Sequence, residues 1–250
     1  MSEIKIPTEV ITLPSKGLLY PKESPLSKGE IEMSYMTARH EDILTNMNYI
    51  KAGNVIDKFL QALIITPIDL DELVDGDKNA ILIAARILGY GKDYPFTYID
   101  PVTRKERNEV LDLSTLDDKE IDESLITPHV NSFKFTLPKS GNEVTFKILT
   151  GKDEKDIENE IKGLKKLYPQ NSFDSTTRLK YMITSINGKV DEASIRKFVD
   201  ELLLAPDARA LREYYAQIAP NVKMEFTPED SEEAISVAIG LDFFWPNAGR

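Results

Sequence analysis

The sequence predicts an α+β fold in which packed helices alternate with several antiparallel β-hairpins, preceded by an extended N-terminal arm. Apolar residues recur at helical spacing in two long regions, 38–90 and 152–220. The region between them, 94–150, contains strand-like segments that are joined by polar turns. We therefore expect an arm over 1–29 and a single α+β unit over 30–250.

The arm is apolar and rich in proline, with Leu18, Leu19 and Tyr20 between Pro14 and Pro21. Proline lacks a backbone N–H and restricts φ, so a helix is disfavoured here. The three apolar side chains need a cover, which can be the rest of this chain or a partner. Both alternatives remain open from the sequence.

A strand and three helices follow the arm. Alternating apolar residues predict a strand over 30–36, and a helix is expected over 38–47. Asn54 is a typical N-cap for a second helix, and Asp75 or Asp77 begins a third. These helices make up the first helical group.

Two hairpins are expected in region 94–150. The first pairs 96–99 with 109–113 across a charged turn, and the second pairs 132–137 with 143–148 across a turn that contains Gly141. The clean alternation of the second pair makes it the clearest strand signal in the chain.

Helices are expected again over 152–220, including one from about 175 to 186. Their apolar residues form a stripe at helical spacing, which predicts a buried face. We expect the core to contain Ile157, Ile161, Leu164, Leu167, Ile195, Phe198, Leu202 and Leu203. If Leu202 is fully buried, its replacement by alanine should cost about 2–5 kcal/mol.

The region 221–250 predicts a hairpin and an aromatic tail that contains Phe243, Phe244 and Trp245. Three adjacent aromatic residues cannot all face one way in a strand, and aromatic residues often anchor protein interfaces. If the tail binds a partner, removal of 242–250 should leave melting nearly unchanged. If the tail belongs to the core, the same truncation should unfold the protein.

The composition excludes several kinds of site. The formal net charge is −11, which argues against a protein that binds nucleic acid through its phosphates. The chain has no cysteine, so disulfides, thiolate metal sites and cysteine nucleophiles are excluded. We expect no membrane-spanning helix, because no apolar stretch approaches 18 residues. The N-terminus does not have the pattern of a signal peptide.

No catalytic or metal-binding motif stands out. The two histidines, His40 and His129, are far apart in the sequence and have no accompanying ligand pattern. The acid-rich segment 71–79 fails as a calcium loop, because Leu73 and Leu82 occupy ligand positions. We therefore expect no catalytic residues, no metal ligands and no cofactor.

Three short motifs point to a family. The sequences LPSKGLLYP over 13–21, MTARHEDIL over 36–44 and DFFWP over 242–246 resemble the T-even phage baseplate hub assembly family. In that family, hairpins can look like zinc ribbons with cysteine pairs. This chain lacks those cysteines, so its hairpins are expected to fold without metal.

The resemblance implies a non-enzymatic phage tail protein that acts in assembly of the baseplate central hub. Its partners would be hub or tape-measure proteins, in the host cytoplasm during assembly, and the chain would be either released or retained in the virion baseplate. Self-association is also compatible with this role. The expected partner contacts are Leu18, Leu19, Tyr20, Phe243, Phe244 and Trp245. The alternative is a hub-associated hydrolase that acts on the cell wall, which would need a clustered acid pair or a metal site.

Overall fold

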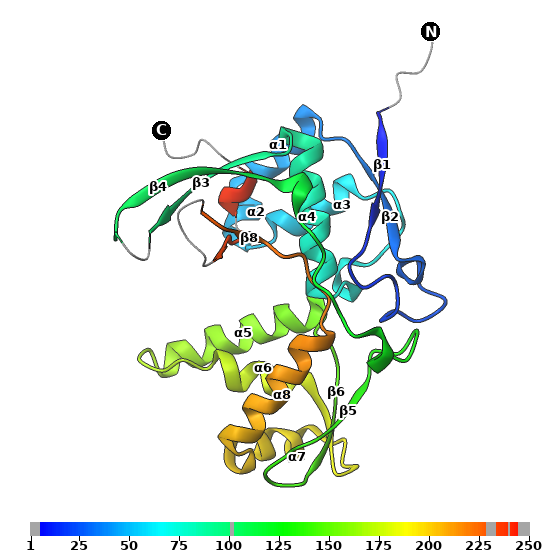
Figure 1. Ribbon diagram of the computed structural model, residues 1–250, viewed down its shortest axis with the longest axis vertical. Coiled ribbons are helices and arrows are strands. Elements are labelled where there is room, and N and C mark those ends of the chain that lie inside the picture. Colours follow the sequence, from blue (N-terminus) through cyan, green and yellow to red (C-terminus); the bar gives the residue numbers. More distant parts are fainter. Residues whose placement is uncertain (1–5, 101–102, 229–233, 240, 245–250) are drawn as a thin grey trace.

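A computed structural model of the chain describes residues 6–100, 103–228, 234–239 and 241–244. The predicted α+β class is confirmed, since these residues contain 8 α-helices and several small antiparallel sheets. Figure 1 shows α1–α4 with β1–β4 in one half of the molecule and α5–α8 with β5 and β6 in the other. One continuous apolar core connects the two halves.

The N-terminal segment packs on its own chain. β1 (Thr8–Thr12) pairs antiparallel with β2 (Glu30–Ser34), with Thr8 opposite Ser34 and Thr12 opposite Glu30. The expected strand over 30–36 is therefore present. Its pairing partner comes from the expected arm, so the described part of 1–29 belongs to the folded unit.

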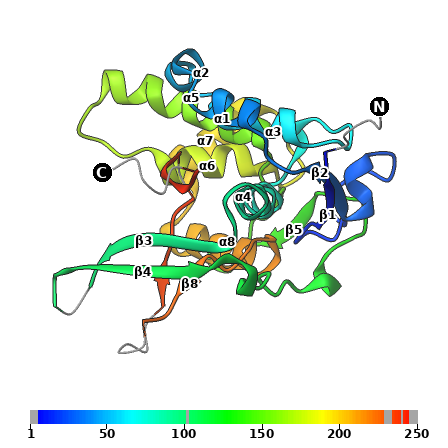
Figure 2. The same cartoon turned by 90° about the horizontal axis from the view of Figure 1, so that it is seen from above.

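Four helices follow β2, namely α1 (Ala38–Leu44), α2 (Met47–Ala52), α3 (Val55–Leu63) and α4 (Asp75–Tyr90). The helix expected over 38–47 ends at Leu44, because Asn46 caps a separate helix. Its Oδ1 accepts the backbone N–H of Asn48 at 2.9 Å. Figure 2 shows α4 end-on in the middle of the molecule, with α1 and α3 on one side and β3 and β4 on another.

Both hairpins predicted between 94 and 150 are confirmed. β3 (Asp93–Ile99) pairs with β4 (Glu106–Asp112), and β5 (Phe133–Thr136) pairs with β6 (Glu143–Phe146). A third strand, β7 (Ile183–Ile186), joins the second hairpin in the order β5-β6-β7.

The helix expected from 175 to 186 is therefore wrong at its end. α6 (Asp174–Met182) stops where β7 begins. Two isoleucines and a threonine in this segment favour a strand, and the open edge of β6 supplies the backbone partners.

Three further helices complete the second half: α5 (Gly151–Leu167), α7 (Glu192–Lys197) and α8 (Ala205–Ile218). A π-helical turn over Phe198–Leu202 continues α7. Short 3₁₀ turns occupy Pro25–Lys28, Leu70–Glu72, Leu113–Thr115, Glu123–Leu125 and Leu241–Phe244.

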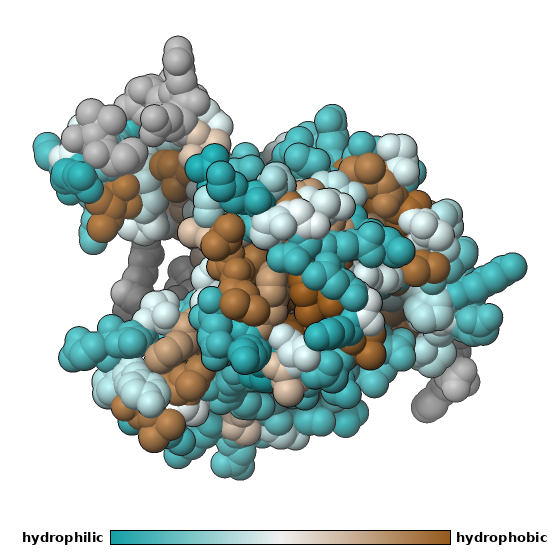
Figure 3. All heavy atoms as spheres, turned by 90° about the horizontal axis from the view of Figure 1, so that it is seen from below, coloured by the Kyte–Doolittle hydropathy of each residue, from teal (hydrophilic) through white to brown (hydrophobic). Residues whose placement is uncertain are grey.

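The predicted apolar stripe is buried only in part. Ile157 and Phe198 are core residues, whereas Leu167 is 73% exposed and Leu202 is 59% exposed. Leu202 is the last residue of the π turn, whose i→i+5 bonding displaces it from the i+4 position that an α-helix would give. Apolar patches lie among polar side chains on the face in Figure 3.

Because Leu202 is exposed, its replacement by alanine should cost less stability than expected for a buried leucine. We expect Leu202→Ala to lower the free energy of unfolding by less than about 1 kcal/mol, because little apolar area returns to water. Leu211→Ala is the matched comparison, since Leu211 is 0% exposed, and it should cost about 2–5 kcal/mol. Urea titrations of the two variants measure the difference, and equal losses would contradict the placement of Leu202.

The predicted C-terminal hairpin is present but short. β8 (Glu225–Phe226) pairs antiparallel with β9 (Ile235–Ser236). Most of the expected polar turn, residues 229–233, lies outside the described residues. Phe226 contacts Phe96 at a ring-centroid distance of 5.2 Å, so β8 packs against the β3–β4 ribbon.

Candidate functional site

The expected partner contacts of the N-terminal segment are not exposed. Leu19 is 2% exposed and Tyr20 is 3% exposed, and Leu18 is half-buried against the core. Their cover is this chain, which is one of the two alternatives that the sequence left open, so the structure gives no support to partner contact at these residues.

Tyr20 and Ser15 bind the buried carboxylate of Asp77, at the start of α4. The Ser15 backbone N–H donates to Asp77 Oδ1 at 2.8 Å, and the Ser15 hydroxyl donates to Oδ2 at 2.6 Å. The Tyr20 hydroxyl also donates to Oδ2, at 2.5 Å, and accepts the Val74 N–H at 3.1 Å. We call Ser15, Tyr20 and Asp77 the latch, because they join the N-terminal segment to α4.

The Asp77 carboxylate of the latch is shielded from solvent. Burial raises the pKa of Asp77, and the hydrogen bonds from Ser15 and Tyr20 oppose that rise. Burial and the nearby Asp77 carboxylate raise the pKa of Tyr20, so its hydroxyl remains a donor. From the sequence, Asp77 was only a helix-starting acid, since its partners lie 62 and 57 residues away.

The glycine of the first motif is required by a close backbone approach. Gly17 has φ +76°, and a Cβ at this position would lie 2.3 Å from the carbonyl oxygen of Ser27. The motif LPSKGLLYP therefore encodes the tight loop that brings Ser15 and Tyr20 to Asp77. The residues of this motif therefore have a structural role within the chain.

The expected tail contacts are likewise part of the core. Phe243 and Phe244 are both 0% exposed. Phe244 meets the ring of Phe59 edge-on at 5.0 Å, and Phe243 packs on Tyr94 at 4.8 Å. The burial of these two residues agrees with the core alternative and gives no support to partner contact there, and Trp245 lies outside the described residues.

A groove of about 450 Å³ opens between α6 and α8 in the second half of the molecule. Its apolar lining comes from Leu149, Leu179 and Met182, which are 3–5% exposed, and from the ring of Tyr215. Burial raises the pKa of Tyr215 to about 12, so its hydroxyl is neutral. We call this the α6–α8 groove.

The polar lining of the α6–α8 groove contains two arginines. Arg178 makes a bidentate ion pair with Glu154 of α5, with N···O distances of 2.5 and 2.7 Å. Arg212 of α8 donates to the Ser175 hydroxyl at 3.4 Å and has no ion pair among the described residues. Asp174 completes the polar lining. The groove therefore combines an apolar floor with one guanidinium, that of Arg212, for which we find no direct carboxylate partner among the described residues.

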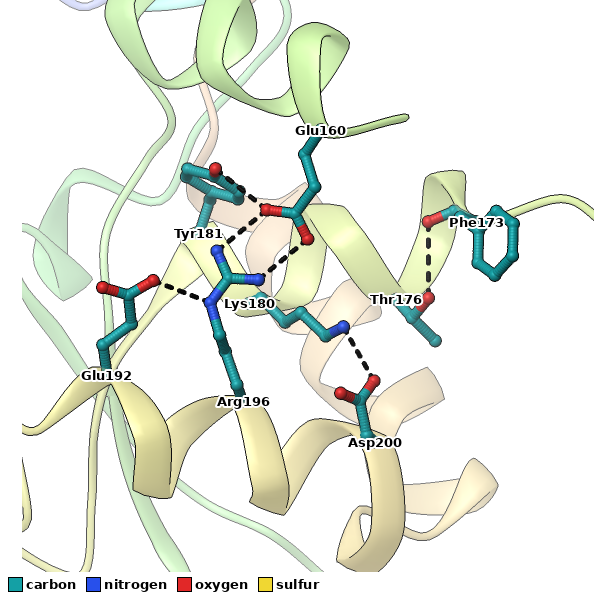
Figure 4. A network of polar contacts seen from close by, with 8 residues as sticks. All are labelled: Glu160, Phe173, Thr176, Lys180, Tyr181, Glu192, Arg196 and Asp200. Carbon is teal, nitrogen blue, oxygen red and sulfur yellow. Dashed lines mark hydrogen bonds and ion pairs between the residues drawn. The ribbon is translucent and has the colours of Figure 1, made fainter. Parts of the chain in front are cut away.

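An ion-pair network joins α6, one of the two helices that line this groove, to α5 and α7 (Figure 4). Arg196 of α7 binds both oxygens of Glu160 on α5 at 2.8 Å, and Tyr181 of α6 donates to the same carboxylate at 3.0 Å. Lys180 of α6 pairs with Asp200 at 2.8 Å. Hydrogen bonding to Glu160 raises the pKa of Arg196, so its charge is permanent. The network holds α5, α6 and α7 at fixed positions.

Asp75, the first residue of α4, interacts with Glu154 behind Arg178. Burial and then the Glu154 charge raise the pKa of Asp75 to about 7. Asp75 is the described carboxyl group whose pKa is raised in part by a hydrogen bond with a second acid. Sequence reasoning had no signal for this pairing, because 79 positions separate the two residues.

The raised pKa of Asp75 predicts a pH-dependent stability. The folded chain holds this proton up to about pH 7, whereas the unfolded chain releases it near pH 4, so stability falls as pH rises across that window. Asp75→Asn should flatten this fall and gain about 1–3 kcal/mol at pH 8 relative to pH 5. Urea midpoints at the two pH values measure it. Asp42→Asn, an exposed change on α1, is the control, and an equal response of both variants would contradict the assignment.

Both histidines have structural partners. The Thr37 backbone N–H donates to His40 Nδ1 at 2.9 Å, which caps α1, and His129 Nδ1 lies 3.1 Å from the Tyr20 carbonyl oxygen. Within the residues that the structure describes, no group of three or more His, Cys, Asp or Glu side chains could hold a metal ion. The helices in that part of the chain include none that is long and apolar enough to cross a membrane.

Comparison of this chain with protein-family models, with curated proteins and with solved structures finds no match.

Proposed function

We propose that this chain is a non-enzymatic phage tail protein that acts in assembly of the baseplate central hub, in the host cytoplasm. The observation that carries the proposal is the pair of motifs at 13–21 and 36–44, which resemble the hub assembly family. Its partners would be hub or tape-measure proteins.

The geometry is compatible with a binding role, but it favours a contact surface away from the arm and the tail. The arm and tail residues are used by the core, so partner contacts must come from side chains that the fold leaves accessible. Leu202 and Leu204, between α7 and α8, are 59% and 45% exposed. The α6–α8 groove adds an apolar cavity with an unpaired cation. Exposed apolar side chains also occur in the other half, for example Met47 and Ile99, so we assign partner binding to the α5–α8 half because of its groove.

The test is quantitative mass spectrometry of assembly intermediates and finished tails from cells that produce this chain. We expect the chain in hub intermediates, together with hub proteins that co-purify with it. Its absence from finished tails would select a released assembly factor, and its presence would select a retained component. Absence from both preparations would refute the proposal.

A cell-wall hydrolase is the second candidate, and one observation favours it. Asp75 and Glu154 form an acid pair, and the pKa of Asp75 near 7 suits a proton donor. Against this role, both Glu154 oxygens already accept hydrogen bonds from Arg178. Release of soluble fragments from purified peptidoglycan by the wild-type chain, lost in Asp75→Asn, would establish it.

A further inference from the structure

We propose that the α6–α8 groove is the docking site for a partner polypeptide that inserts a large apolar side chain and places a neighbouring carboxylate on Arg212. The inference deepens the proposed function, since it rests on that function for the partner's role in assembly. The chemistry of the segment it would bind follows from the groove.

The size and lining of the groove suit an apolar side chain. A volume of about 450 Å³ lies within the range of pockets that enclose a ligand group. Leu149, Leu179 and Met182 form a floor without charge. The network around Arg196 joins α6, which carries Leu179 and Met182, to α5 and α7. An inserted aromatic ring would bury the remaining exposed carbon of this floor, which is the usual way that interface anchors act.

Arg212 supplies the second half of the recognition. Its neighbours Arg178 and Arg209 already have carboxylates, Glu154 and Glu213 respectively. The one hydrogen bond that we find from the Arg212 guanidinium to a described residue goes to the Ser175 hydroxyl, at 3.4 Å. A guanidinium presents planar paired donors that match a carboxylate, and this one remains available at the groove.

The charges around the α6–α8 groove indicate which kind of anion could bind there. Asp174 lines the same groove, Glu154 lies behind Arg178, and the whole chain carries a net charge of −11. A polyphosphate backbone would bring several negative charges to these acids for the single guanidinium of Arg212, and it would leave the apolar floor uncovered. A single carboxylate beside an apolar side chain satisfies both parts of the groove, which favours an acidic peptide segment.

The experiment follows the methyl group of Met182 by ¹³C NMR in the full-length chain. The sequence has 6 methionines, and Met182→Leu assigns the resonance. The probe is acetyl-Phe-Glu-amide, compared with acetyl-Phe-Lys-amide and acetyl-Ala-Glu-amide. We expect a saturable Met182 shift with the first probe, and at least about fivefold weaker binding for the other two, because each lacks one part of the recognition.

Arg212→Gln should weaken binding of acetyl-Phe-Glu-amide about fivefold or more and remove the preference over acetyl-Phe-Lys-amide. Arg209→Gln is the matched control, because it removes the same charge from the same helix at a residue outside the groove lining. Both variants should melt like the wild type. Arg212→Lys should recover part of the preference, since it restores the charge without the planar donors.

Any of these results would overturn the inference: no Met182 shift with acetyl-Phe-Glu-amide, equal binding of the glutamate and lysine probes, or equal effects of the two arginine variants. Tighter binding of octanoate than of the peptide would also overturn it, in favour of a small amphipathic acid. Peptide binding is measured without hub proteins, so a failure here leaves the proposed function standing. A protein that binds the peptide but is absent from hub intermediates would fail the proposed function instead.

Discussion

Replacement of Asp77 by alanine is expected to destabilise the fold by about 3–5 kcal/mol. The change removes the acceptor of three hydrogen bonds and leaves the Ser15 and Tyr20 donors buried without a partner. Asp77 and Ser15 are 0% exposed, so water cannot replace the carboxylate unless the loop opens. Urea denaturation measures the loss.

A double-mutant cycle separates the latch from simple loss of packing. Tyr20→Phe alone removes one donor, and Asp77→Ala should cost less in the Tyr20→Phe background than in the wild type. Asp42→Ala, on the exposed side of α1, should change stability by less than about 0.5 kcal/mol. A loss below about 1 kcal/mol for Asp77→Ala, or strict additivity with Tyr20→Phe, would show that the latch contributes little.

The second large effect is expected at the C-terminal aromatics. Phe244→Ala should lower the free energy of unfolding by about 3–5 kcal/mol, since Phe244 is 0% exposed and packs against Phe59 of α3. Removal of 242–250 should destabilise at least as much, because it also removes Phe243. Calorimetric melting and urea titration measure both losses.

Phe173→Ala is the matched control for this prediction. Phe173 is half-buried, and its ring contacts Tyr168 at a centroid distance of 6.0 Å at the α5–α6 connection. Its truncation should cost clearly less than that of Phe244. If the 242–250 truncation melts like the wild type and instead loses hub proteins, the tail is a partner surface after all.

The elements of this fold were largely predictable because their signals are local. The hairpins β3–β4 and β5–β6 follow from alternating side chains around polar turns, and α4 follows from an acidic first turn before an apolar helix. Each signal depends on residues that are close together in the sequence, so it does not depend on contacts with distant segments.

The errors arose where a distant segment decided the outcome. Residues Ile183–Ile186 have apolar spacing that also suits a helix, but the open edge of β6 makes them a strand. Leu202 has helical spacing with Phe198, but the π turn displaces it toward solvent. No short window of sequence contains the edge of β6, and helical spacing alone does not distinguish a π turn from an α-helical one.

The candidate contact residues show the same division. The residues themselves specify an apolar arm and tail, an acidic surface charge, the absence of thiol chemistry and a glycine at position 17. Packing between remote segments determines that Leu19, Tyr20, Phe243 and Phe244 are buried, that Ser15 meets Asp77, and that Arg212 is left without a carboxylate. The hydrophobicity of a side chain predicts that it will be buried. Which surface buries it depends on the neighbours that the tertiary structure places beside it.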